Sequence, residues 1–485
     1  MSASHPPPLG PRKAPPVASR SSEQPSFRFA TLQRPEGATV NAAVEGVHKN
    51  SAAPLQQIDK RSYFHDASST PLDSLSLEKN TSWAPTALRP VPAFYPLEKS
   101  SRLIEDTTPV ALAIRLVECL RQLSVHAVYD NAAATASLLT QEHVEMHLSL
   151  WNTPVTAHTP GVLVELQRRK GDSMAFHRYS RVILDAAVGD WDDNYQQHAV
   201  GSQVDSVVYS KKVQRLLTLH NKSGQDEHEN ALVAIEIAHG LLLKDRMDAR
   251  QLGLESLCLL TDPRKTGYVT AVLTSHVVLL GSLQGIEIPG VDLEAVLVDD
   301  SPLEEIRQAI LSLVQFSRIG EDDEADDGQE QTMTDTEHLT LLHNLALAVL
   351  ANALQVIETS PETYYEEDDE EPEDAKPRAR LRTASSSDVT NEFLKATEET
   401  SKHEILSTLI RELSQAGSKP HDACLSAKCL GTICKASDEA RKRAKELGAK
   451  TVVATALDVG QQTHLKLETE CEKVQKVLTL TNMDD

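Results

Sequence analysis

The stretch from Gly161 to Ala187 reads GVLVELQRRKGDSMAFHRYSRVILDAA, and its pattern decides the fold of the first folded part of this 485-residue chain. Val162, Val164 and Leu166 occupy every second position, which is the period of a strand with one buried face. Gly171 then ends the alternation. The first half of the stretch therefore predicts a strand followed by a turn.

The second half of the stretch has the pattern of an amphipathic helix. Asp172 and Ser173 are residue types whose side chains accept hydrogen bonds from the free N–H groups at a helix start. The apolar residues that follow cluster toward one side of a helix: Met174, Phe176, Tyr179, Val182 and Ile183. We expect a helix with one buried face.

The same two periods recur upstream of this stretch. The segment DTTPVALAIRLVECLRQL, residues 106–123, has a capping Thr, Pro109 at the first helical position and a stripe of leucines. Three strand patterns follow it, SVHAVYD, ATASLLT and HVEMHLSLW. The order of one helix, four strands and one helix predicts an α+β docking domain over residues 99–200, with a small antiparallel sheet and helices on one face.

Helical patterns replace strand patterns after residue 200. Apolar segments separated by short polar or Gly/Pro joints predict a mostly α-helical, armadillo/HEAT-like array in two parts, residues 201–358 and 391–485. Two acidic segments without periodicity predict a loop at 320–336 and a disordered acidic and basic linker at 359–390.

The N-terminal segment has a different composition. Fourteen of the 24 prolines precede residue 100, and neither period persists there. Such a segment cannot bury enough apolar surface to offset the entropy lost on ordering. We therefore predict a long disordered Pro/Ser-rich tail over residues 1–98, with VPAFYPLEK as a candidate docking piece. No targeting signal is expected in this segment, because it lacks the apolar core of a signal peptide.

Composition and charge restrict the classes of partner. The formal net charge of -23 argues against general nucleic-acid binding, because polyphosphate would be repelled. The six cysteines lie in helical patterns, which favours reduced thiols and a cytoplasmic location, with the nucleus as an alternative. The apolar segment Leu339–Ile357 is interrupted by His343 and Asn344, so we predict a buried helix rather than a membrane span.

The predicted α+β domain resembles the kinase-associated C-terminal domain, the small module that ends AMP-activated-type protein kinases. The resemblance covers residues of about 105–188, through the strand pattern VEMHLSLW and through Gly171, Asp172, Ser173 and Phe176. It implies a module that docks on regulatory subunits or on anionic phospholipid. No Gly-rich loop, catalytic Asp motif or Asp-Phe-Gly motif precedes it, so a kinase catalytic domain is not expected.

Five basic residues in the opening stretch form a candidate anionic-partner patch: Arg168, Arg169, Lys170, Arg178 and Arg181. The first three fall at the strand end, and the other two share a helical face, so all five could converge. One interpretation is attraction to an anionic membrane or partner. The alternative is that the patch pairs with the acidic loops of the same chain or forms a solvated sheet edge.

Two further motifs predict chemistry. His143, Glu145 and His147 have the spacing of one strand face and are weak candidate metal ligands. The simpler interpretation is a solvent face of the strand, since no fourth ligand is evident. Ser385 follows Arg380 and Arg382 at the spacing that basophilic kinases use, which makes it a phosphorylation candidate. Beyond these weak ligands, we expect no metal, no cofactor and no catalytic residue.

The function predicted from these patterns is that of a non-enzymatic intracellular adaptor or scaffold. Protein partners would bind the helical-repeat surface and the α+β docking domain, and no small-molecule substrate is predicted. The first alternative is a peripheral membrane protein that binds anionic phospholipid through the basic patch. The second alternative is a metal-dependent enzyme with His143, Glu145 and His147 as ligands.

Overall fold

A computed structural model of the chain describes residues 82–92, 94–152, 161–190, 226–287, 301–315, 333–359, 382–400 and 404–479. All of them belong to the second of two units into which the chain divides, Pro71–Asp485. The structure confirms a small antiparallel sheet followed by a mostly helical C-terminal region. The two parts have separate hydrophobic cores.

The sheet is built from six strands. Their bounds are β1 Arg89–Pro90, β2 Ser101–Glu105, β3 His126–Asp130, β4 Thr135–Leu139, β5 Glu145–Asn152 and β6 Gly161–Lys170. The order β2-β6-β5-β4-β3 is antiparallel throughout, and β1 adds a short parallel pair to β5. The four predicted strands correspond to β3 to β6. The sequence analysis missed β1 and β2, because β1 is two residues long and β2 buries only Ile104.

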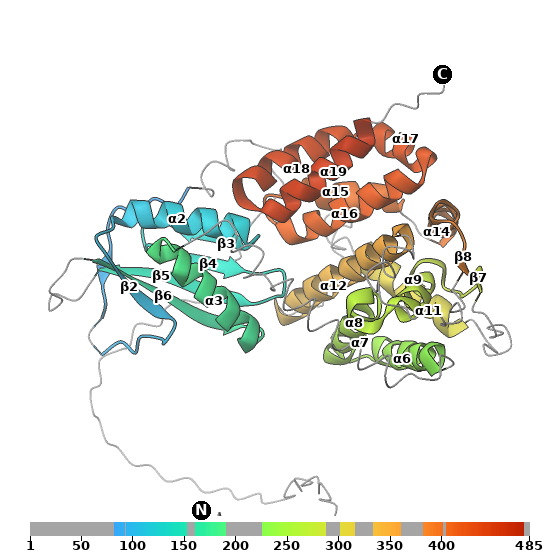
Figure 1. Ribbon diagram of the computed structural model, residues 1–485, viewed down its shortest axis with the longest axis horizontal. Coiled ribbons are helices and arrows are strands. Elements are labelled where there is room, and N and C mark those ends of the chain that lie inside the picture. The colour runs from blue at the N-terminus through green and yellow to red at the C-terminus, as the bar shows by residue number, and fades with distance from the viewer. Residues whose placement is uncertain are drawn as a thin grey trace, which may run out of the picture. The chain divides into compact units, whose positions relative to one another are not determined.

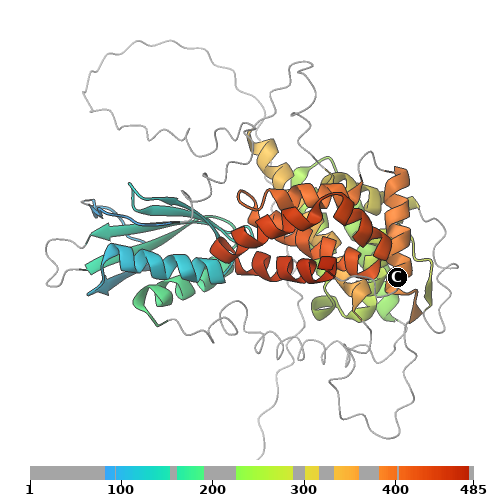
Figure 2. The same ribbon diagram turned by 90° about the horizontal axis from the view of Figure 1, so that it is seen from above.

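Two helices cover one face of this sheet, α2 (Pro109–Gln122) and α3 (Ser173–Val188), as Figures 1 and 2 show. The Thr108 side chain caps α2 by accepting from the N–H of Ala111, and Asp172 caps α3 by accepting from the N–H of Ala175. The predicted strand, turn and helix of the opening stretch are therefore confirmed. Gly171 has a φ of 94°, and a Cβ there would meet the backbone of His143 at 2.6 Å.

The prediction of a disordered tail to residue 98 is wrong for residues 82–92 and 94–98. Trp83 is buried and stacks on Tyr129, with ring centroids 5.4 Å apart. Tyr95 packs against Trp151 on the sheet face that the helices leave open, and its hydroxyl donates to Glu165. The segment VPAFYPLEK thus docks on the sheet of its own chain. Burial of aromatic side chains stabilises this segment, although its proline-rich composition predicted disorder.

The helical region follows the predicted segments closely. Its helices are α6 Asp226–Leu242, α7 Met247–Leu260, α8 Pro263–Thr266, α9 Tyr268–Leu280, α11 Ser301–Val314, α12 Met333–Glu358, α14 Ser386–Thr400, α15 Ile405–Ser414, α16 Pro420–Ala436, α17 Asp438–Glu446, α18 Ala449–Thr463 and α19 Leu465–Thr479. Two strands of two residues each, β7 (Ile286–Glu287) and β8 (Arg382–Thr383), pair with each other. The Leu447-Gly448-Ala449 turn separates α17 from α18.

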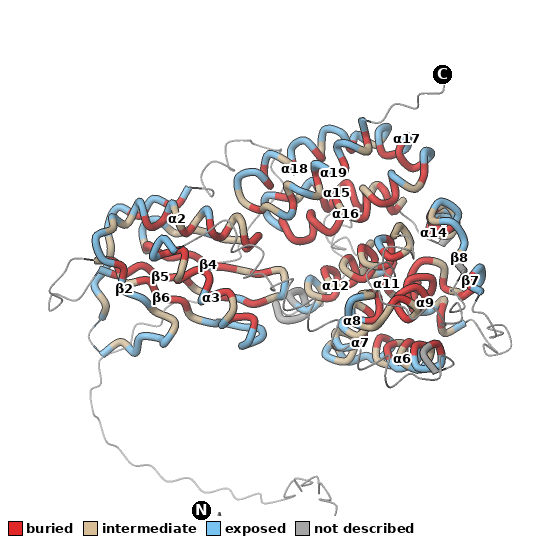
Figure 3. The backbone as a smooth tube through the Cα atoms, viewed as in Figure 1, coloured by how far each residue is buried: buried red, intermediate tan, exposed pale blue. Residues whose placement is uncertain are grey.

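Helix α12 lies at the centre of this region and packs against α7, α9, α11 and α16. Figure 3 shows α9 and much of α12 as buried. The segment His338–Glu358 of α12 is long and apolar enough to cross a membrane, but 61% of its most apolar window is buried inside the protein. Burial by neighbouring helices explains this apolar composition without a bilayer.

One predicted boundary in the helical region is wrong. Residues 382–390, assigned to a disordered linker, include β8 and the first residues of α14. The start of the predicted array at 201–225, most of the acidic loop at 320–336 and the acidic part of the linker lie outside the described residues.

Candidate functional site

The five residues of the predicted basic patch are divided between two faces of the α+β domain. Arg168 continues the register of Val164 and Leu166, which is the side that the helices cover. Arg169 points to the opposite side, where its charge contributes to lowering the pKa of the His147 imidazole, after the larger effect of burial. Strand alternation therefore separates two residues that are adjacent in the sequence.

Several of the basic side chains have partners nearby. The Arg168 guanidinium donates to the Gly171 carbonyl at 2.7 Å. Lys170 lies 3.7 Å from the Glu145 carboxylate, and Arg178 forms an ion pair with Glu142. Arg181 is exposed on α3. The predicted pairing with acidic loops concerns segments outside the described residues.

The predicted metal ligands His143, Glu145 and His147 do not extend along one strand face. His143 precedes β5 in a turn with a φ of 57°, so strand alternation does not reach it. The His143 side chain is hydrogen-bonded to Asn344, and burial is the main cause of its lowered pKa. His143 therefore does not lie on the strand face that the predicted metal site requires.

Ser385, the predicted phosphorylation site, lies directly before α14. Its hydroxyl donates to the Asp388 carboxylate at 2.7 Å and accepts from the Asp388 N–H at 3.2 Å. The residue is exposed. Its position is that of a helix cap, which is a structural role that the linker prediction did not include.

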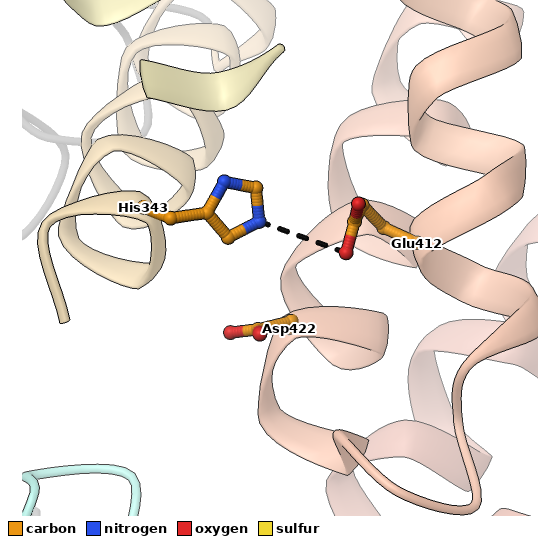
Figure 4. A group of neighbouring side chains, drawn as sticks. All are labelled: His343, Glu412 and Asp422. Atoms are coloured by element: carbon orange, nitrogen blue, oxygen red, sulfur yellow. Dashed lines mark ion pairs between the residues drawn. The ribbon is translucent and has the colours of Figure 1, made fainter. Parts of the chain in front are cut away.

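Another group of polar side chains lies buried between helices of the C-terminal region. One ligand atom each of His343, Glu412 and Asp422 lies within 4.8 Å of the other two. Figure 4 shows the imidazole of His343, from α12, directed at the carboxylate of Glu412, from α15. Asp422 comes from the first turn of α16. We call these three residues the buried polar triad.

Local sequence explains how each member reaches the same point. His343 lies among leucines and alanines in α12, so its ring is carried into the core with them. Glu412 lies on the buried side of α15, three residues after Leu409 and directly before Leu413. Asp422 lies where free N–H groups at a helix start favour a carboxylate.

The hydrogen bonds of the buried polar triad are well defined. The Nδ1 atom of His343 donates to the Leu313 carbonyl at 2.8 Å. The Asn344 amide donates to Asp422 Oδ1 at 2.5 Å. The Nε2 atom of His343 lies 3.6 Å from Oε2 of Glu412, and neither of these two atoms has a hydrogen-bond partner. The triad thus contains two polar atoms that face each other without a bond.

Burial and charge act in opposite directions on these groups. Burial alone would lower the pKa of His343, but the Glu412 carboxylate, the charge of Asp422 and the bond to Leu313 outweigh it and raise that pKa. Burial alone would raise the pKa of Glu412, yet the neighbouring His343 lowers it. Both shifts favour a protonated imidazole beside an ionised carboxylate.

The sequence carried one signal for this triad. His343 and Asn344 interrupt an otherwise apolar helix, and polar residues within a buried helix need partners. The partners themselves are on helices far along the chain, and no local period connects them. Sequence reasoning therefore identified an anomaly at His343 but not the group.

Comparisons with known proteins add no assignment. No protein-family model matches the chain, and no curated protein is similar to it. Among solved structures, a crystal structure of an engineered protein matches 50% of this chain and 96% of its own at 12% identity, with a TM-score of 0.19.

Proposed function

We propose that this protein is a non-enzymatic intracellular adaptor that binds protein partners through the surface of its helical region. The observation that supports this proposal is a set of exposed large apolar side chains on the first helix pair. Val233 and Ile237 on α6 and Leu252 and Leu259 on α7 are between 47% and 59% exposed. We infer that these four side chains form one apolar face, because contiguous apolar patches that remain exposed are typical of interaction surfaces.

The helix pair holds this face in a fixed position. At Gly253, an added Cβ would lie 2.9 Å from the Leu242 nitrogen and 3.1 Å from the Ala238 carbonyl, so the two helices approach closely. The opposite sides of α6 and α7 supply Ile235 and Leu254 to the main core. A partner would therefore meet a preformed surface and would lose little conformational entropy in ordering it.

Two further parts of the proposal concern the type of helical repeat and a second docking module. An armadillo/HEAT-like repeat would give the helical region a continuous binding surface, and the packing of consecutive helices such as α6 on α7 and α18 on α19 supports that assignment. A kinase-associated-like α+β domain would provide a second docking module. The order of helix, antiparallel strands and helix supports this part.

Affinity capture tests the proposal. Full-length tagged wild type would be compared with Ile237→Glu and Leu252→Glu, which place a charge on the apolar face. Asn230→Glu, at an exposed polar position of α6, is the matched control. We expect specific proteins to be retained by wild type and by the control and to be lost from both apolar-face variants. Identical recovery from all four proteins would refute the proposal.

The alternative proposal is binding of anionic phospholipid by the basic patch. The exposed side chains of Arg168, Arg169 and Arg181 support it. The division of Arg168 and Arg169 between two faces weighs against it, because a flat membrane meets one face at a time. Sedimentation with vesicles of increasing phosphatidylserine content would show charge-dependent binding if this alternative holds. Binding that survives reversal of the five charges would exclude it.

A further inference from the structure

The spacing of the buried polar triad resembles that of a metal coordination shell. Zinc binds nitrogen and carboxylate oxygen at about 2.0–2.2 Å, which places neighbouring tetrahedral ligands about 3.3–3.6 Å apart. The Nε2 atom of His343 and Oε2 of Glu412 are already 3.6 Å apart. The remaining separations reach at most 4.8 Å. A modest side-chain rotation of Asp422 or Glu412 would bring all three ligand atoms around one ion.

Two of the prospective ligand atoms lie at ion-pair distance from each other but have no hydrogen-bond partner among the described residues. The side chains of His343 and Glu412 are only 5% and 6% exposed, yet Nε2 and Oε2 make no hydrogen bond. Buried polar atoms are nearly always bonded, and an atom that lacks a protein partner often binds an ion or a water molecule. Figure 4 shows these atoms directed at each other.

The hydrogen bonds around the triad orient it for a cation. Because Nδ1 of His343 donates to the Leu313 carbonyl, Nε2 is the ring atom that can take up either a proton or a metal ion. Nε2 faces a carboxylate oxygen, so a positive charge between the two atoms, carried by a proton or by a metal ion, is favourable. The Asn344 amide holds Asp422 from outside the triad, as second-layer groups of metal sites do.

Two buried carboxylates next to each other favour a cation at this point. Glu412 and Asp422 are both buried, and an uncompensated charge is costly in the interior. The Arg411 guanidinium lies 3.8 Å from Oε1 of Glu412. A cation between the three ligand atoms would add positive charge on the other side of that carboxylate, beside Oε2.

We propose that His343, Glu412 and Asp422 bind one divalent transition-metal ion, for which Zn²⁺ is the best match, in the core of the helical region. One imidazole and two carboxylates are nitrogen and oxygen donors suited to Zn²⁺, whereas Ca²⁺ takes six to eight oxygen ligands. The ion would join α12 to α15 and α16. The site is independent of the adaptor function proposed above.

Direct metal binding tests this assignment. Full-length protein would be treated with a chelator, dialysed and titrated with Zn²⁺ against a chromophoric competitor. We expect one tight site per chain. The nearly isosteric variants Glu412→Gln and Asp422→Asn each remove one charged ligand. Each should weaken this site by at least about 100-fold, since loss of a second-layer group alone costs about 10- to 100-fold.

The control is Glu358→Gln, which removes a carboxylate at the end of α12 that pairs with Lys435 and is not part of the triad. It should leave the affinity unchanged. Asn344→Ala keeps all three ligands and should weaken Zn²⁺ binding by about 10- to 100-fold. Asn344→Ala keeps the test decisive if removal of a ligand prevents folding. Circular dichroism would reveal such a loss of structure.

A second readout locates the ion. Co²⁺ in place of Zn²⁺ should give visible absorption typical of a low-symmetry site, and that absorption should be absent from Asp422→Asn and present in Glu358→Gln. The proposal is overturned if wild type binds no Zn²⁺ tightly. It is also overturned if Glu412→Gln, Asp422→Asn and Asn344→Ala bind the ion as wild type does.

Discussion

Removal of the Glu165 carboxylate should destabilise the α+β domain strongly. Glu165 lies on β6 and has no exposed surface. Its two oxygens accept from the Tyr95 hydroxyl at 3.1 Å, the Trp151 indole N–H at 3.1 Å and the Glu98 backbone N–H at 2.9 Å. This carboxylate therefore connects the N-terminal segment to two strands of the sheet.

The expected cost follows from the fate of the three donors in Glu165→Ala. Tyr95 and Glu98 are not buried, so water can replace the lost acceptor there. The indole N–H of the buried Trp151 would be left unsatisfied, at about 1–3 kcal/mol. The lost charge-assisted bonds and the vacated volume add about 2 kcal/mol. The free energy of unfolding should therefore fall by about 3–5 kcal/mol, a large part of the stability of a typical domain.

Urea denaturation followed by tryptophan fluorescence measures this loss. Trp83 and Trp151 both lie in the α+β domain, so their fluorescence reports on its core. The third tryptophan, Trp191, lies outside the described residues and is replaced by Phe in all proteins compared. Glu145→Ala is the matched control, because Glu145 is an exposed carboxylate on the neighbouring strand β5. The control should change the unfolding free energy by no more than about 0.5 kcal/mol. A Glu165→Ala result within that range would refute the assignment of a buried, connecting carboxylate.

Three other predictions concern stability. Asp172→Ala should lower the unfolding free energy of the α+β domain by about 1 kcal/mol in urea titrations, and Asp172→Asn should lower it less, because the amide oxygen still caps α3. Gly253→Val should lower the melting temperature, because its side chain would separate α6 from α7, and Gly240→Val at an open position of α6 should not. His276 is buried without hydrogen-bond partners, and burial lowers its pKa from 6.5 to about 4. The unfolded chain therefore binds more protons than the folded chain between pH 6.5 and pH 4. The folded state loses stability as the pH falls through this range, and the loss between pH 7 and pH 5 is about 2 kcal/mol. His276→Leu should remove that part of the pH dependence in thermal melts, and an unchanged pH slope would contradict the assignment.

The local elements of the fold were predictable from the sequence. The alternation of Val162, Val164 and Leu166 and the turn at Gly171 predicted β6 and the start of α3, and both are present. Elements with little periodicity were missed. β1 is two residues long, and proline-rich composition concealed the burial of Trp83. Composition describes the average of a segment, whereas a single aromatic side chain can anchor it.

The candidate sites were less predictable than the elements. The basic patch was expected to converge because its residues are close in sequence, but successive side chains on a strand point to opposite faces. Glu165 lies in the same stretch of sequence as that patch, yet it is buried and bonded to Tyr95. The buried polar triad appeared in the sequence only as an interruption of an apolar helix at His343.

The sequence by itself determined where helices and strands form, because their periods, caps and turns are written within a few residues of each other. Only the tertiary structure decided which charged groups are buried and what they face. Glu165 meets Tyr95, and His343 meets Glu412 and Asp422, across long separations in the chain. Contacts of this kind depend on how whole elements pack, and no local period encodes them.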